Sequence, residues 1–157
     1  ESWALTPKYI WVRPGSAMPE LGPEPYRALL VAKTEAECGW RARFTHHPVA
    51  TGCMYFLAWG DDCSVWHDCV DAANLAAHDF GDIPDDALVM TTWHQNEPLE
   101  EAMWFSHHCA SHPDVELQRF HILHLGEQGD PERVLSLYDT AINAPLDERG
   151  NAPWDRV

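Results

Sequence analysis

Residues 53–77, CMYFLAWGDDCSVWHDCVDAANLAA, decide the fold. The first part, Cys53–Trp59, is an apolar run without in/out alternation, which is typical of a strand covered on both faces. Gly60, Asp61 and Asp62 then predict a turn and a helix start, because either aspartate can cap a helix. The residues that follow predict a helix with one apolar stripe, formed by Trp66, Cys69, Val70, Ala73 and Ala77.

The same succession of strand and helix recurs along the chain. Further strands are predicted at Tyr26–Ala32, Ala87–Trp93 and Arg119–Leu125. Strands that alternate with helices favour right-handed crossovers and a parallel sheet. The sequence therefore predicts a single three-layer α/β domain, with a four-stranded, mainly parallel sheet and helices on both faces.

Each of the other helices also has a recognisable start. Thr34 and Glu37 have the spacing of a capping box. Asn96 or Glu97 precedes Pro98 at the start of the third helix, and Asp130 followed by Pro131 is a strong signal for the fourth.

The two ends of the chain are predicted to be irregular but to belong to the same domain, residues 1–157. Residues 1–25 read as an arm rich in Pro and Gly, with a possible short strand at Tyr9–Val12. Residues 145–157 are polar and predict an irregular tail.

The charge balance indicates the kind of partner. Asp and Glu number 25 against 10 Lys and Arg, which gives a net charge of −15. Such a surface repels phosphate and attracts basic protein, so neither nucleic acid nor a membrane is an expected partner. No apolar run approaches the ~18 residues of a membrane-spanning helix. The alternative is that acidity only keeps the domain soluble.

The cysteines favour a reducing compartment. There are five, an odd number, and no two form a CxxC pair. Reduced thiols in the cytoplasm are the simpler interpretation.

Reactive residue types follow the second and third predicted strands. In an open parallel sheet, ligands bind beyond the carboxyl ends of the strands. We therefore expect one edge of the sheet to gather Asp61, Asp62, Trp66, His67, Trp93, His94, Asn96 and Glu97. Helix capping alone also explains the aspartates and Asn96, and core packing explains the two tryptophans.

Catalytic and cofactor signatures are weak. Gly-rich phosphate loops and the GxSxG elbow are absent, so no cofactor is expected. Cys63 is conceivable as a nucleophile, because it lies near a helix start with His67 or His94 as base. His108 and His112 have helical metal-ligand spacing, but the glutamate of an HExxH motif is absent and Pro113 follows directly.

Five stretches in the central part of the chain carry a resemblance: Tyr55–Gly60 (YFLAWG), Asp62–Trp66 (DCSVW), Gly81–Asp86 (GDIPDD), Met90–His94 (MTTWH) and Glu97–Glu101 (EPLEE). With them, residues 53–125 resemble a family of small, acidic bacterial α/β proteins, a domain of unknown function. The resemblance implies the domain type and a bacterial origin, but no active site.

Two functions remain open. The first is a cytoplasmic protein-binding domain, most plausibly a bacterial immunity protein that neutralises a basic toxin domain such as a nuclease. Its binding residues would be Asp61, Asp62, Trp66, Asp82, Asp85, Asp86, Trp93, His94, Glu97, Glu100 and Glu101.

The alternative is a small hydrolase at the same edge of the sheet. Its catalytic residues would come from Asp62, Cys63, His67, His94 and Glu97. An enzyme needs a concave pocket in which His67 or His94 contacts a carboxylate, whereas an interface needs an acidic patch with exposed aromatic side chains.

Overall fold

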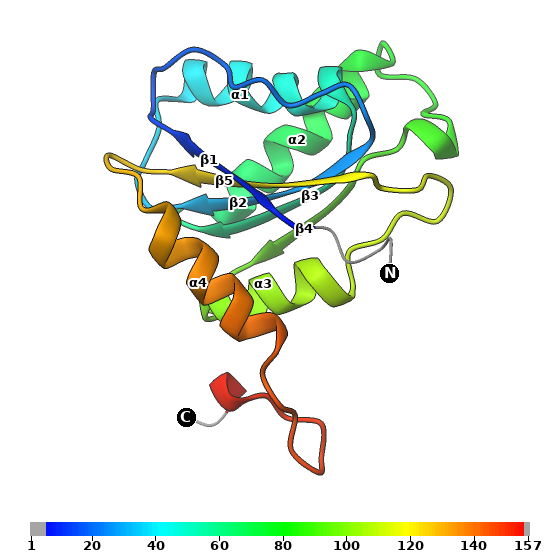
Figure 1. The fold of residues 1–157 in the computed structure, drawn as a ribbon. Helices are drawn as coiled ribbons and strands as arrows, with labels where there is room; N and C mark the ends of the chain where they lie inside the picture. The colour runs from blue at the N-terminus through cyan, green and yellow to red at the C-terminus, as the bar shows by residue number, and fades with distance from the viewer. Residues whose placement is uncertain (1–5, 156–157) are drawn as a thin grey trace.

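A computed structural model describes residues 6–155 and shows a parallel sheet between two layers of helices (Figure 1). Over these residues the sheet has five strands in the order β1-β5-β2-β3-β4, and every neighbouring pair is parallel. The strands are β1 (Lys8–Val12), β2 (Tyr26–Ala32), β3 (Cys53–Gly60), β4 (Met90–His94) and β5 (Arg119–Leu125).

The helices are divided between the two faces of the sheet. In Figure 1, α1 and α2 cover one face, while α3 and α4 cover the other. Their bounds are α1 (Cys38–Thr51), α2 (Cys63–Ala77), α3 (Leu99–His108) and α4 (Pro131–Ile142), with short 3₁₀ helices η1 (Asp85–Ala87) and η2 (Pro153–Asp155). The α/β class and the parallel sheet are confirmed.

The predicted strand number was wrong, because β1 joins the sheet as its fifth strand. The short strand expected at Tyr9–Val12 is present and pairs with β5, from Lys8↔His121 to Val12↔Leu125. The Trp11 indole also donates a hydrogen bond to the Gly126 carbonyl at 2.9 Å. Part of the expected irregular arm is therefore an edge strand, which five residues alone signal only weakly.

Two hydrophobic cores lie on opposite faces of the sheet. Along β2 the side chains alternate between them: Ala28 and Leu30 pack under α1 and α2, while Leu29 and Val31 pack under α3 and α4. All seven residues of β2 are buried. This explains why the sequence shows an unbroken apolar run instead of an alternation.

The helix starts follow the prediction in part. Asp130 caps α4 as expected, because its carboxylate accepts from the Arg133 amide. The α1 cap is Glu37 and not Thr34, so the predicted capping box was wrong. Asp62 is the cap residue of α2 with φ 58°, but no described helix amide bonds its carboxylate. Its backbone carbonyl accepts from Val65 and Trp66 instead.

The third predicted strand was too long at its amino end. Asp85–Ala87 form η1, and β4 begins at Met90. None of the helices within the described residues is long and apolar enough to cross a membrane.

Gly60 allows the turn from β3 toward α2. Its φ of +99° is unfavourable for a side chain, and a Cβ there would lie 2.1 Å from the Ala32 carbonyl oxygen. We expect Gly60→Ala to lower the free energy of unfolding by about 1–3 kcal/mol, measured from urea unfolding. Gly15→Ala is the control, because Gly15 also has a positive φ but nothing within 4 Å. Equal effects of the two changes would show that the contact with Ala32 is unimportant.

Candidate functional site

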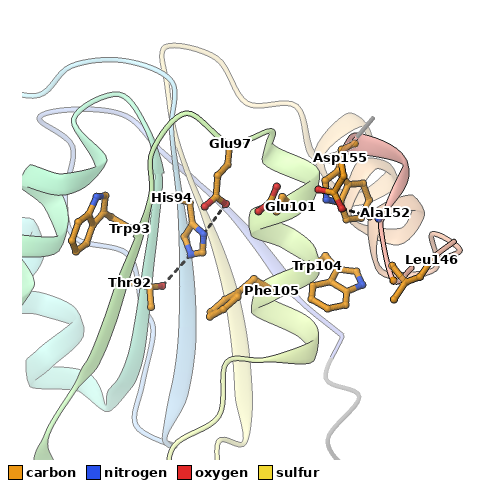
Figure 2. A pocket seen from close by; sticks show the side chains of 12 residues that line it. Thr92, Trp93, His94, Glu97, Glu101, Trp104, Phe105, Leu146, Ala152 and Asp155 are labelled. Atoms are coloured by element: carbon orange, nitrogen blue, oxygen red, sulfur yellow. Dashed lines mark hydrogen bonds and ion pairs between the residues drawn. The ribbon is translucent and has the colours of Figure 1, made fainter. Parts of the chain in front are cut away.

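A pocket of about 470 Å³ opens beside the edge strand β4, between α3 and the C-terminal segment (Figure 2). It lies toward the carboxyl end of β4, on the face of the sheet that carries α3. The residues that line it are Thr92, Trp93, His94, Glu97, Glu101, Trp104, Phe105, Leu146, Gly150, Ala152, Trp154 and Asp155.

The alternation of side chains along β4 determines which of them reach this pocket. Thr92 and His94 are two residues apart, so they project to the same face of the sheet. Trp93 projects to the other face, where its ring packs edge-on against His67 with centroids 4.5 Å apart. In Figure 2, Trp93 points away from His94 and from the pocket wall formed by α3.

His94 is the centre of the polar wall. It is 6% exposed, and both of its ring nitrogens have partners. Nδ1 lies 3.0 Å from Glu97 Oε2, and Nε2 lies 3.0 Å from Thr92 Oγ1. The Phe105 ring packs against the imidazole at 5.1 Å with an interplanar angle of 60°. The imidazole is thus fixed in position and contacts a carboxylate, the condition stated above for an enzyme site.

The start of α3 supplies the second wall. Trp104 and Phe105 lie three and four residues after Glu101, so both neighbour it on one side of the helix. The loop before α3 is held by Trp59, whose indole donates to the Glu97 carbonyl at 2.8 Å. Glu97 therefore has a fixed backbone while its carboxylate reaches His94.

The third wall is the C-terminal segment, which is more ordered than an irregular tail. The Asp147 carboxylate accepts from the amides of Arg149 and Asn151 at 2.9 and 2.8 Å, which closes a tight turn. The Asp155 carboxylate accepts from the Ala152 amide at 2.8 Å. Trp154 packs against the core under α3 and α4, so it fixes this segment to the domain.

The pocket concentrates negative charge. Burial raises the pKa of Glu101 above its ordinary value of 4.5, and the nearby carboxylates of Glu97 and Asp155 raise it further, while His94 opposes them. None of the described lining residues is Lys or Arg. These carboxylates thus repel one another, and neither Lys nor Arg lies beside them among the described residues of the pocket wall.

Several predicted site residues do come together. Asp61, Asp62 and Cys63 line a second pocket of about 400 Å³ with Gln95 and Asn96. This pocket also includes His94 and Glu97, so the two pockets adjoin. The expected edge with carboxylates from two successive loops is therefore present.

Other predicted residues lie elsewhere. Trp66 is 1% exposed and belongs to the core under α1 and α2, so it is not a surface anchor. Asp82, Asp85 and Asp86 lie before the amino end of β4, whereas Asp61 and Asp62 follow the carboxyl end of β3. In a parallel pair, the amino ends and the carboxyl ends of the strands lie at opposite ends of the sheet. The prediction that these aspartates form one acidic surface was therefore wrong.

Two of the proposed catalytic side chains, His67 and Cys63, do not line the pocket beside α3. His67 lies on α2, on the opposite face of the sheet. Its Nδ1 lies 2.9 Å from Asp68 Oδ1, and its Nε2 lies 3.5 Å from Asp71 Oδ2. Cys63 is 4% exposed at the first turn of α2. Neither therefore reaches the pocket beside α3.

The expected metal spacing of His108 and His112 was wrong. α3 ends at His108, so the two residues do not share a helical face. His112 Nε2 bonds the Leu88 carbonyl at 2.7 Å, and Nδ1 accepts from the Asp114 amide at 3.1 Å. A group suited to a metal within the described part of the chain is His67, Asp68 and Asp71 on α2, where His67 and Asp71 also contact Trp93 and Thr91 of β4.

Ligands in open parallel sheets often bind where the strand order reverses. In this sheet the reversal lies between β2 and β5, and β3 separates it from β4. A cavity of about 730 Å³ there includes Lys33, Glu100 and the Gly126–Asp130 loop. The Asp130 carboxylate already occupies the start of α4, which weakens this end as an anion site. The pocket at β4 combines hydrogen-bonded polar groups with aromatic walls and is the better candidate.

Thr92, Trp104, Phe105, Trp154 and Asp155 were missed from the sequence. Thr92 could have been found because it alternates with His94 along a strand. Trp104 and Phe105 could have been found from their helical spacing to Glu101. Trp154 and Asp155 carry no such signal, since only the path of the C-terminal segment brings them to the pocket.

The fold and the pocket define a parallel α/β protein with an acidic, aromatic-walled site at an edge strand. The sequence comparison then shows the family. Residues 7–141 match the family described as Domain of unknown function (DUF7684), and the chain belongs to it. The resemblance to a domain of unknown function, seen over residues 53–125, lies within this match and is confirmed. No curated protein and no solved structure matches the chain.

The charge of Glu101 should cost stability. Its folded-state pKa lies above the ordinary value of 4.5, so stability is lost as the pH rises through the folded-state pKa. We expect Glu101→Gln to raise the free energy of unfolding at pH 7, and this gain to disappear below pH 4.5, where Glu101 is protonated in both states. Urea unfolding at several pH values measures the difference.

Glu100→Gln is the matched control, because Glu100 also lies in the first turn of α3 but does not line the pocket. Both changes remove a favourable interaction with the helix dipole. A Glu101→Gln protein no more stable than Glu100→Gln at pH 7 would contradict the expected repulsion in the pocket.

Proposed function

We propose that this domain binds a basic protein and that the pocket beside β4 receives a Lys or Arg side chain of that partner. The observation that carries the proposal is the composition of the pocket. Carboxylates of Glu97, Glu101 and Asp155 lie among aromatic walls, with no Lys or Arg among the described lining residues. Carboxylates pair with cationic groups, and aromatic faces attract them too.

The electrostatics of the pocket support a cationic occupant. Glu101 is destabilised as a carboxylate by burial and by two neighbouring carboxylates. A bound ammonium or guanidinium would compensate this repulsion. The net charge of −15 would in addition attract a basic partner over a longer range and raise its association rate.

The surface around the pocket is large enough to contact more than one side chain. The adjoining pocket adds Asp61 and Asp62, and it shares His94 and Glu97 with the first. Trp93 is 48% exposed on the same strand. Its ring lies on the opposite face of the sheet from His94, and an exposed tryptophan is the kind of anchor that contributes strongly at protein interfaces.

The partner class that this surface fits best is a basic toxin domain, with the present domain as its immunity protein. If the toxin is a nuclease, a cluster of carboxylates can occupy the site at which the toxin binds the phosphate of nucleic acid. The five cysteines, all within the described residues, are free, and Cys38 and Cys109 are exposed, which supports action in the reducing cytoplasm. Rescue of cells that express a basic toxin encoded beside this gene tests this role. Absence of rescue by a well-expressed domain contradicts it.

Binding can be tested with a blocked tetra-arginine peptide, using intrinsic tryptophan fluorescence because Trp104 and Trp154 line the pocket. We expect Glu101→Gln/Asp155→Asn to weaken binding by about 10-fold or more, since a charge-assisted hydrogen bond contributes about 1.5–3 kcal/mol. Tetra-glutamate should not bind.

Asp85→Asn/Asp86→Asn removes the same charge from the opposite edge of the sheet and is the matched control. It should reduce affinity only slightly, through the long-range field, and this small effect should vanish at high salt. Equal losses in the two double variants would show that the peptide responds to net charge and not to the pocket.

A further inference from the structure

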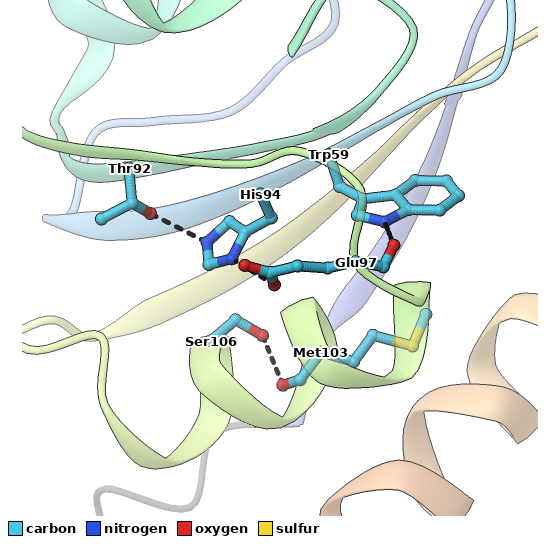
Figure 3. A network of polar contacts seen from close by, with 6 residues as sticks. All are labelled: Trp59, Thr92, His94, Glu97, Met103 and Ser106. Atoms are coloured by element: carbon cyan, nitrogen blue, oxygen red, sulfur yellow. Dashed lines mark hydrogen bonds and ion pairs between the residues drawn. The ribbon is translucent and has the colours of Figure 1, made fainter. Parts of the chain in front are cut away.

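Thr92, His94 and Glu97 form a line of hydrogen bonds inside the pocket (Figure 3). Thr92 Oγ1 lies 3.0 Å from His94 Nε2, and Glu97 Oε2 lies 3.0 Å from His94 Nδ1. The hydroxyl and the carboxylate thus contact opposite nitrogens of one imidazole. Thr92 and His94 come from β4, while Glu97 comes from the loop before α3.

The chemistry of the carboxylate determines where the protons lie. An ionised carboxylate can only accept a hydrogen bond, so His94 Nδ1 must carry a proton and donate a hydrogen bond to Glu97. In the neutral ring Nε2 then holds a lone pair and accepts from the Thr92 hydroxyl. This is the order of nucleophile, base and orienting carboxylate found in hydroxyl-based acyl transfer.

We propose that Thr92 is a nucleophile for acyl transfer, with His94 as its general base and Glu97 as the residue that positions His94. The substrate class is a small carboxylic ester or thioester. A preference for esters that carry a positive charge rests on the proposed function, because Glu101 and Asp155 lie in the same pocket.

The surroundings hold these groups in place. Trp59 fixes the Glu97 backbone at 2.8 Å, and Phe105 packs against the His94 ring at 5.1 Å. His94 is buried, whereas Thr92 is only half-buried and lines the pocket, so a ligand can reach the hydroxyl. Such prior positioning lowers the cost of bringing nucleophile and base together.

The reaction would proceed in two balanced steps. Thr92 Oγ1 attacks the acyl carbon while its proton passes to His94 Nε2, and the alcohol or thiol leaves with that proton. The acyl group is then bonded to Thr92 Oγ1. Water then attacks this ester while His94 Nε2 accepts one of its protons. The bond between the acyl carbon and Thr92 Oγ1 breaks, His94 returns the proton to Oγ1, and the carboxylic acid is released.

Two features can stabilise the oxyanion that forms. Tyr55 is buried and hydrogen-bonds Thr92, and burial raises its pKa, so a protonated hydroxyl lies beside the proposed nucleophile. β4 is also an edge strand, and no described strand pairs with its outer side. Hydroxyl and backbone N–H donors of this kind form oxyanion holes.

The test measures hydrolysis of p-nitrophenyl acetate, a neutral ester, and of acetylthiocholine, a cationic thioester. Thr92→Val keeps the shape of the side chain and should abolish hydrolysis of both. His94→Asn should lower the rate at least ~100-fold. Thr91→Val is the matched control, because Thr91 bonds Asp71 on the other face of the sheet at 2.7 Å, and it should retain full activity.

Two readouts separate chemistry from folding. Acid-quenched wild-type protein should carry an acetyl group on the peptide that contains Thr92, detected by mass spectrometry. Glu97→Gln should lower the rate and shift its pH midpoint downward, because the imidazolium loses its carboxylate partner. A purely structural role for Glu97 would leave the pH midpoint unchanged.

Hydrolysis that is equally fast in wild type and in folded Thr92→Val would overturn the inference. So would the absence of both ester hydrolysis and Thr92 acetylation in the wild-type protein. Tetra-arginine binding measured on the same samples tests the proposed function separately, since Thr92→Val keeps every carboxylate of the pocket.

Discussion

The pairing of β4 with β3 determines which side chains reach the pocket. In this register Leu57 lies opposite Thr92 and Trp59 opposite His94. A slip of one residue would turn Trp93 toward α3 and remove Thr92 and His94 from the site. Side chains of α2 oppose such a slip: Asn74 donates to the Ala87 carbonyl at 3.2 Å and accepts from the Val89 amide at 2.9 Å, just before β4 begins.

The pocket combines features that do not favour stability. Its carboxylates lie close together, and burial disfavours the charged form of Glu101. Proteins tolerate such local costs where function needs them. The cost is borne by a well-packed domain: β2 is fully buried between two cores, and Trp154 ties the C-terminal wall to one of them. The same carboxylates would bind a cationic group, and His94 with Thr92 would act on a group held beside it.

The sequence predicted the elements better than the site. The bounds of β2 and β5 were predicted to the residue, and for β2 this is because burial on both faces leaves a mainly apolar run. β1 was hard to predict, since its five residues gain stability mainly from pairing with β5. The edge with Asp61, His94 and Glu97 followed from topology alone. The helical pattern placed Trp66 on the apolar stripe, and its core position agrees with that stripe and not with the interface role. No local pattern shows that Asp155 returns to the pocket, because this depends on how distant segments pack.

Amide NMR shifts during titration with tetra-arginine test most directly that this pocket is the binding site. If it is, the largest shifts should fall in β4, in the first turns of α3 and in residues 146–155, with His94 and Glu101 among them. Amides of the loop that carries Asp82, Asp85 and Asp86, at the opposite edge of the sheet, should move little. Shifts spread over both edges, or concentrated at that loop, would contradict a specific cation site beside β4.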